Sequence, residues 1–320
     1  MLKMNRILLF FLCALLQFTF CGVGNAQMRS LPPSFKEWIR SDGMKHSTVT
    51  LEIVRLPRTA PQQTPDSLNP AINRGRVLYS YDPERLMTPA SVLKLVTAAT
   101  GFRLLGPNYV WPDSVPMIDT VAVRLPGLER FNPDLLVEDI EEYMPGLDNL
   151  LPDSGQMLMD VMDRTLAESL NLQAETMLHL LTPSCRLDSG LLTVQNYWRK
   201  RGLDMESLVM YDGCGISPSN RVTAHFINSL LADMQFDSAF RKAMADIAQE
   251  GTVREFLKGT RLAGKGQLKT GTLKNVVAYA GYIKGSDART YAVTIFVANN
   301  TCKHAEVRKE IEKLLLSLIP

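Results

Sequence analysis

Ser91 and Lys94 stand three residues apart in the segment MTPASVLKLVTAAT (87–100), which is almost wholly apolar apart from the lysine. Residues at this spacing share one face of a helix, so the hydroxyl and the amine would be neighbours. Burial lowers the pKa of a lysine, and a neutral amine can remove the proton of a serine hydroxyl. The pair therefore predicts an activated serine nucleophile. Taken alone, this tetrad favours a simpler interpretation, in which Lys94 reaches solvent and Ser91 caps the helix.

A second pattern, Lys269-Thr270-Gly271, ends one strand-like segment and precedes another. In S-x-x-K enzymes a K-T-G triplet lines the edge of the sheet beside the nucleophile. Its lysine supplies positive potential, its hydroxyl can hold a carboxylate, and its glycine lets a substrate backbone approach closely. In isolation the same residues would suit an exposed hairpin lysine followed by a turn glycine.

The third pattern expected of such a site, S-x-N, occurs twice, as Ser67-Leu68-Asn69 and as Ser169-Leu170-Asn171. The second copy lies between the other two patterns and in a helical region, so we assign it to the site. Ser169 would then relay a proton between Lys94 and the leaving group, and Asn171 would donate a hydrogen bond to the substrate amide. The first copy is interpreted as loop polarity.

In this order the three patterns resemble those of penicillin-binding proteins of the D-Ala-D-Ala carboxypeptidase/endopeptidase family, the class C low-molecular-mass group. The resemblance covers roughly residues 45–110 and 155–300. Further stretches carry it: SLNLQAE (169–175) is similar to S-D-N-L-Y-A-E, DGCGISPSNRVT (212–223) is similar to D-G-S-G-L-S-x-x-N-R-V-T, and EGTVREFLKGT and LKTGTLKNVVAYAGYI resemble the family's final third.

The resemblance implies a role for each matching residue. Ser91 would be the acylated nucleophile and Lys94 its base. Ser169 and Asn171 would form the second element, and Lys269, Thr270 and Gly271 the third, with the backbone amides of Ser91 and Thr272 as the oxyanion hole. The implied substrates are peptidoglycan stem peptides ending in D-Ala-D-Ala, with β-lactams as covalent inhibitors and neither a metal nor a cofactor.

The sequence also departs from that family. Members usually carry large accessory domains between the first two patterns, and the interval from Lys94 to Ser169 leaves no room for them, which predicts a compact form. Cys214 stands where D-G-S-G has serine, which we interpret as a packing change. Two other functions stay open: a β-lactamase or esterase on the same fold, although no E-x-x-L-N segment is present, and a retired module that only binds the cell wall.

Composition and charge narrow the class of protein. The chain has 320 residues, 46% hydrophobic and 21% charged, with a formal net charge of +2, which argues against both nucleic-acid binding and disorder.

Residues 1–26 resemble a signal peptide, so we expect an exported, periplasmic protein; an uncleaved membrane anchor or lipidation at Cys21 would be alternatives. Beyond that leader remain Cys185, Cys214 and Cys302, an odd number without metal-ligand spacing; one disulfide or three buried thiols would fit. Oligomeric state is not encoded in any pattern we recognise.

Hydrophobic periodicity predicts an α/β (α+β) chain, folded as one domain over residues 27–320. The family resemblance implies that this fold is penicillin-binding-protein/β-lactamase-like. An antiparallel five-stranded sheet, drawn from both ends of the chain, would be flanked by helices, with a mostly helical insertion at about 85–265. Residues 57–75 predict a proline-rich loop, and residues 110–153 an irregular lid-like or packing segment. The expected strands are 47–56, 76–83, 266–271, 275–285 and 290–299. The first expected helix is capped by Thr88, has Pro89 at its first position and stops at Gly106-Pro107. Further helices are expected at 156–181 (one broken helix or a pair), 189–201, 221–234, 238–249 and 302–318.

Overall fold

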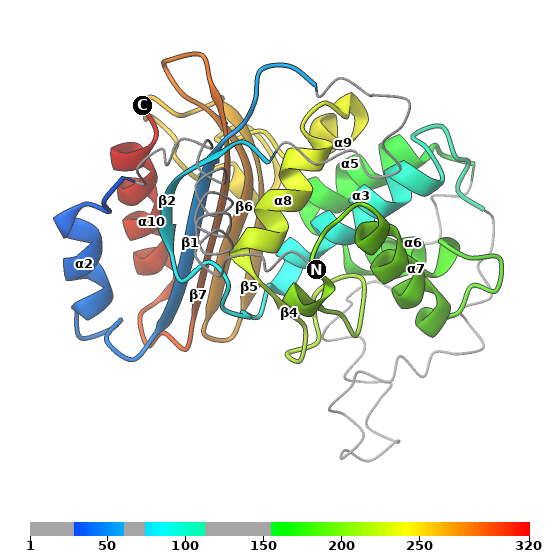
Figure 1. Ribbon diagram of the computed structural model, residues 1–320, viewed down its shortest axis with the longest axis horizontal. Helices are drawn as coiled ribbons and strands as arrows, with labels where there is room; N and C mark the ends of the chain where they lie inside the picture. Colours follow the sequence, from blue (N-terminus) through cyan, green and yellow to red (C-terminus); the bar gives the residue numbers. More distant parts are fainter. Residues whose placement is uncertain (1–28, 61–73, 113–154) are drawn as a thin grey trace, which may run out of the picture.

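A five-stranded antiparallel sheet combines strands from both ends of the chain, as expected from the sequence (Figure 1). The computed structural model describes residues 29–60, 74–112 and 155–320. Strand order is β2-β1-β7-β6-β5, with β5 at one edge. The strands are β1 (Thr48–Arg55), β2 (Arg76–Tyr81), β5 (Gly266–Leu273), β6 (Val276–Lys284) and β7 (Thr290–Ala298). A further two-residue pair joins β3 (Leu208–Val209) to β4 (Arg221–Val222).

Helices cover both faces of the sheet. On one face lie α10 (His304–Leu318) and α2 (Pro33–Arg40), and the apolar stripe predicted for the closing helix is buried there. On the other face lie α3 (Lys94–Leu104), α5 (Leu158–Glu168), α6 (Asn171–Leu180), α7 (Leu187–Lys200), α8 (Ala224–Met234) and α9 (Ser238–Lys242). In the described part of the chain, no helix combines the length and the apolar character needed to cross a membrane.

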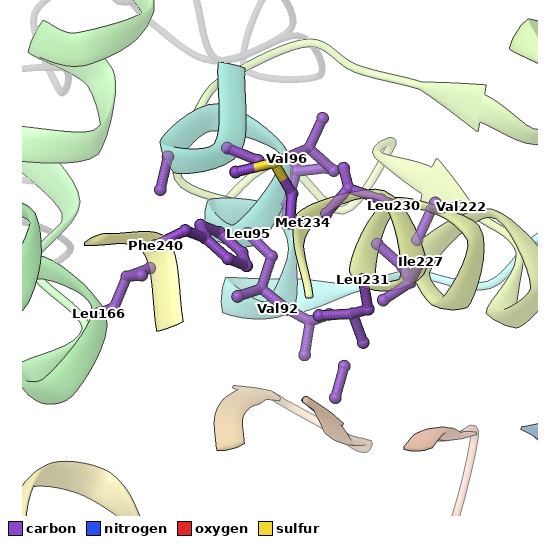
Figure 2. Packing of buried hydrophobic residues seen from close by; sticks show 14 of the residues in the cluster. Val92, Leu95, Val96, Leu166, Val222, Ile227, Leu230, Leu231, Met234 and Phe240 are labelled. Atoms are coloured by element: carbon purple, nitrogen blue, oxygen red, sulfur yellow. The ribbon is translucent and has the colours of Figure 1, made fainter. Parts of the chain in front are cut away.

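The helix that follows the nucleophile is anchored by apolar side chains. Val92, Leu95 and Val96 are fully buried and pack against side chains of α8 and against Phe240 of α9 (Figure 2). Each buried side chain of this size stabilises the folded state by roughly 1.5–3 kcal/mol. The start of α3 is therefore held rigidly between the sheet and α8.

Two sequence predictions about helix ends are wrong. Thr88 does not cap the helix: residues Ala90–Leu93 form a 3₁₀ turn, η1, ahead of α3, and the Thr88 hydroxyl accepts a hydrogen bond from Arg221 instead. The helix expected over 238–249 ends at Lys242, because the chain then pairs with β5, where Leu268 donates its N–H to the Ala245 carbonyl.

The other outcomes are mixed. Strand positions and the pair of helices within 156–181 are confirmed, and the stop at Gly106 is confirmed by its φ of 83° after α3. Helix α2 was missed, because it has only eight residues and begins with Pro33 directly after Pro32. The leader 1–26, Ser67-Leu68-Asn69 and most of the segments 57–75 and 110–153 lie outside the described residues.

A buried polar seam joins α8 to the sheet. The Glu52 carboxylate of β1 is 3% exposed and accepts hydrogen bonds from His225 Nδ1 and Asn228 Nδ2, each at 3.0 Å. Thr294 of β7 donates in turn to Asn228 Oδ1 at 2.8 Å. Because a buried carboxylate is costly unless it is paired, this network fixes where α8 sits on the sheet.

The seam predicts a pH-dependent contribution to stability. Its hydrogen bond to Glu52 raises the pKa of His225 above the ordinary 6.5. The stabilisation from this pair is therefore complete below pH 6.5 and is lost as the pH rises through the raised value. In urea unfolding we expect His225→Gln to destabilise the protein more at about pH 5.5, below the ordinary histidine pKa, than at about pH 9.

The exposed His46 provides a control, since His46→Gln removes an imidazole that has no partner among the described residues. If His225→Gln lowered the free energy of unfolding by the same amount at both pH values, the coupling between His225 protonation and its pairing with Glu52 would be contradicted.

Candidate active site

The nucleophile lies on the 3₁₀ turn η1 and its neighbour at the first position of α3. In a 3₁₀ turn, residues three apart are eclipsed, so Ser91 and Lys94 point the same way. Lys94 Nζ lies 3.0 Å from Ser91 Oγ. The simpler interpretation, in which Lys94 reaches solvent, is wrong, because this lysine is 1% exposed.

Three oxygen atoms surround the Lys94 amine. Besides Ser91 Oγ, they are Asn171 Oδ1 and the Cys214 carbonyl, each 2.7 Å from Nζ. A carbonyl and an amide oxygen can only accept, so both take an N–H from the amine. A neutral amine has two N–H groups and one lone pair, and its lone pair is then left facing the Ser91 hydroxyl. The arrangement orients Lys94 as a general base.

Burial also favours the neutral amine. It lowers the pKa of Lys94, while the nearby Cys214, Glu175 and Asp212 oppose that shift. The Glu175 carboxyl is itself fully buried, and burial together with the neighbouring Asp212 raises its pKa to about 7. A carboxyl that is only partly ionised at neutral pH stabilises a Lys94 ammonium less than a fully ionised one would.

The acceptor carbonyl of Cys214 is positioned by two buried carboxyls. Glu175 Oε1 accepts the N–H groups of Gly213 and Cys214 at 2.8 and 2.7 Å. Asp212 accepts those of Gly215 and Ser217, each at 2.6 Å. The turn is thus fixed from both sides. The sequence analysis assigned no role to Glu175 or Asp212. The available signal was an acid one helical turn after Asn171.

Glu175, Asp212 and Cys214 place one carboxylate or sulfur atom each within 4.8 Å of one another. The oxygens of both acids are engaged with backbone N–H groups, so the cluster is a hydrogen-bonding core. Burial raises the pKa of the Cys214 thiol well above its ordinary value, and the neighbouring Glu175 and Asp212 add to this effect. A thiol in that state is inert, which agrees with a packing role for Cys214.

The backbone ahead of Ser91 is constrained. Ala90 adopts a φ of 47°, a conformation that L-residues with a side chain rarely take. The Gly215 backbone presses against it: a Cβ at Gly215 would lie 2.0 Å from the Ala90 carbonyl oxygen and 3.1 Å from the Ser91 nitrogen. Such strain persists only where its surroundings hold it, and here it sets the direction of the Ser91 amide.

The open edge of β5 runs past this turn. Gly266 and Leu268 use their outward main-chain groups to pair with Ile247 and Ala245. Alternate residues of a strand point these groups to the same edge, and the pairing of β5 with β6 is unbroken. Thr270 and Thr272 therefore direct their N–H groups outward, beyond the covered stretch.

Gly271 brings that edge against the nucleophile. A Cβ there would lie 2.5 Å from the Pro89 carbonyl oxygen and 3.1 Å from the Val92 nitrogen. Thr272 is exposed. Its outward N–H and that of Ser91 stay the predicted oxyanion donors. Two convergent backbone donors are the usual means of stabilising an oxyanion.

Lys269 is fully buried and donates to the Thr270 carbonyl at 3.0 Å. Burial, and secondarily the charge of Lys94, lowers its pKa well below the ordinary value. In the described part of the chain it has no carboxylate partner, so an arriving anion would meet an uncompensated amine that gains a proton on binding. Thr270 Oγ1 is 2.9 Å from Thr252 Oγ1.

The predicted residues thus fall into two groups. Ser91, Lys94 and Asn171 are joined by hydrogen bonds, with Lys269 and Gly271 on the adjacent strand. Ser169 caps α5 with a φ of 64°, and among the described residues its hydroxyl contacts neither Ser91 nor Lys94. Its predicted role as a proton relay stays a prediction.

This sheet, with a serine and a lysine at the start of a buried helix beside the edge strand, defines a penicillin-binding-protein/β-lactamase-like fold. Penicillin-binding protein 4 from Haemophilus influenzae superposes with a TM-score of 0.64 over 90% of this chain and 99% of that one, at 13% identity. A β-lactamase from Chitinophaga pinensis gives a TM-score of 0.56 over 88% and 98%, at 15% identity.

Residues 69–124 and 142–318 match the D-Ala-D-Ala carboxypeptidase 3 (S13) family, and the chain belongs to that family. A D-alanyl-D-alanine carboxypeptidase from Actinomadura sp. (strain R39) is 34% identical over 110 residues. That alignment takes in 31% of this chain and 20% of the relative, so the chain matches only about a fifth of the relative's length.

The close contact between Gly215 and Ala90 can be tested with two glycines. Gly202 has a similar φ, 78° against 86°, but a Cβ there would meet nothing within 4 Å. Gly202→Ala should cost about 1–2 kcal/mol of unfolding free energy for the left-handed backbone alone. Gly215→Ala should cost about 1–3 kcal/mol more, because the turn and Ala90 must separate. Urea unfolding of both variants measures the difference, and equal losses would show that the contact adds nothing.

Proposed function

We propose that the chain is an exported serine D-Ala-D-Ala carboxypeptidase/endopeptidase that acts on peptidoglycan stem peptides through an acyl-enzyme on Ser91. The observation that carries this proposal is the buried Lys94 amine, whose two N–H groups are taken by Asn171 and the Cys214 carbonyl. Its lone pair is then directed at Ser91 Oγ. Membership of the D-Ala-D-Ala carboxypeptidase 3 family supports the substrate class.

In the acylation step, Lys94 takes the Ser91 proton as the oxygen attacks the carbonyl carbon between the two D-alanines. The negative charge that develops on the carbonyl oxygen is held by the N–H groups of Ser91 and Thr272. The C–N bond then breaks, the leaving amine receives a proton from the Lys94 ammonium, directly or through Ser169, and D-alanine departs. Water activated by Lys94 hydrolyses the ester. In cross-links the same steps would release a peptide rather than D-alanine.

The substrate's terminal carboxylate would bind beside β5. Lys269 supplies the positive charge there, and the Thr270 and Thr272 hydroxyls can donate hydrogen bonds to the carboxylate. The outward main-chain groups of Thr270 and Thr272 would pair with the peptide as an added strand. Asn171 would hold the substrate amide with its side-chain N–H₂.

A fluorescent penicillin tests the assignment, because a β-lactam presents the same acyl carbonyl to the serine. We expect covalent labelling of the full chain, loss of labelling in Ser91→Ala, and release of D-alanine from a peptide ending in D-Ala-D-Ala. Mass spectrometry of the labelled peptide locates the adduct. Labelling that persists in Ser91→Ala would refute the nucleophile, and rapid loss of the penicilloyl group would indicate a β-lactamase.

The state of Lys94 gives a second prediction. Since burial lowers its pKa, the acylation rate should rise with pH and level off below the ordinary lysine value of 10.5. Lys94→Arg should slow acylation by at least about 100-fold, because a guanidinium keeps its proton. Stopped-flow acylation measures both effects.

Lys274→Arg, at an exposed lysine next to β5, is the matched control and should keep the wild-type rate. A Lys94→Arg variant that acylates as fast as the control would make Lys94 a purely structural residue.

A further inference from the structure

A basic cavity lies at the end of the sheet away from the outward N–H groups of Thr270 and Thr272. Its volume is about 560 Å³. It is bordered by α9, by the ends of β1 and α8, by the start of β5, and by the residues of β6 and β7 next to their connecting turn. Figure 1 shows that turn, in orange, at the upper end of the sheet. At about 3.3 Å per residue, Gly266 at the cavity is roughly 20 Å along β5 from Thr272.

Four cationic side chains line this cavity, and none of the described aspartates or glutamates does. They are Arg58, Arg241, Lys265 and Lys284. Lys265 directly precedes β5 and Lys284 ends the neighbouring β6, and the Lys284 N–H donates to the Lys265 carbonyl at 2.6 Å. Both lysines are exposed, and several cations around one cavity give it a positive potential that attracts anions.

In the described part of the chain, none of these four cations has a carboxylate partner. The acids that flank the cavity are engaged with other groups: Asp246 accepts from Gln267 Nε2 at 2.9 Å, and Asp287 accepts from the Tyr291 hydroxyl at 2.6 Å. An exposed lysine without a partner is ordinary, but four cations around one cavity of ligand size are not.

Arg241 gives the cavity a fixed donor. Its guanidinium donates to Gln267 Oε1 at 3.0 Å and stacks over the Tyr282 ring, 4.8 Å from the ring centroid. A guanidinium held in this way loses little freedom when it binds an oxyanion with its remaining N–H groups. Phe236, 47% exposed, supplies an apolar wall on the same cavity.

We propose that this cavity binds carboxylates of a second stem peptide on the same peptidoglycan strand. This inference rests on the proposed function, which supplies the polymer, since each stem ending in D-Ala-D-Ala carries a free carboxylate. A stem held here would anchor the strand while its neighbour occupies the Ser91 site, about 20 Å away along β5. Two sites joined through one polymer gain affinity over either site alone.

The test measures binding separately from catalysis. Full-length chain carrying Ser91→Ala is cosedimented with purified polymeric peptidoglycan, with and without the added pair Lys265→Gln and Lys284→Gln. We expect binding about tenfold weaker in the triple variant, as for the loss of two partly solvated charge contacts. Peptidoglycan whose carboxylates have been amidated should bind both proteins equally weakly.

Lys36→Gln with Lys309→Gln removes the same charge from exposed positions on α2 and α10, and should leave binding unchanged. An equal loss in this control, or a loss that persists on amidated peptidoglycan, would overturn the proposal in favour of non-specific attraction. As a further test, inorganic phosphate and a single-stem peptide are each added as competitors of polymer binding. If phosphate displaces the polymer at the same concentration as the peptide does, the assignment to carboxylates is overturned.

Failure of the proposed function would be recognised by a different result. In the Ser91-containing protein, the Lys265→Gln and Lys284→Gln pair should leave penicillin labelling and turnover of a soluble single-stem peptide unchanged. Absence of both activities in the wild-type chain would refute the enzyme, whereas unchanged polymer binding with both activities intact would refute the cavity alone.

Discussion

The burial of one amine governs the arrangement of this protein. In the proposed mechanism Lys94 acts on Ser91 as a neutral amine, which burial favours, and a buried amine needs acceptors for its N–H groups. Asn171 at the start of α6 and the Cys214 carbonyl supply them. Glu175 and Asp212 hold the turn that carries that carbonyl, so segments far apart in the sequence serve one nitrogen atom.

The sheet and the helices perform different tasks in that arrangement. The sheet offers β5 as a straight, partly open edge, and the glycine at position 271 lets it touch the nucleophile turn. Apolar packing between α3 and α8 fixes where the turn lies (Figure 2), and the Glu52 seam fixes α8 on the sheet. The chemistry therefore depends on contacts well outside the site itself.

Much of this could be predicted from sequence because the signals are local. Alternating apolar residues gave the five strands, and the spacing of Ser91 and Lys94 gave the reactive pair. Features that depend on tertiary contact could not be predicted. The 3₁₀ turn before Lys94, the early end of α9 and the strained Ala90 each arise from a neighbour, β5 or Gly215, that lies far away in the sequence. Glu175 lies within a recognised motif, but only the fold shows that its carboxyl accepts the N–H groups of Gly213 and Cys214.

The pairing of residues 245–247 with the start of β5 has a consequence for solubility. An uncovered edge strand is a template on which another chain can add a strand, and long edges of this kind promote aggregation. Here the segment after α9 covers Gly266 to Leu268, and among the described residues no strand pairs with the outer edge of Thr270 to Thr272. That stretch suits a short peptide but gives a foreign β-strand few main-chain groups to pair with.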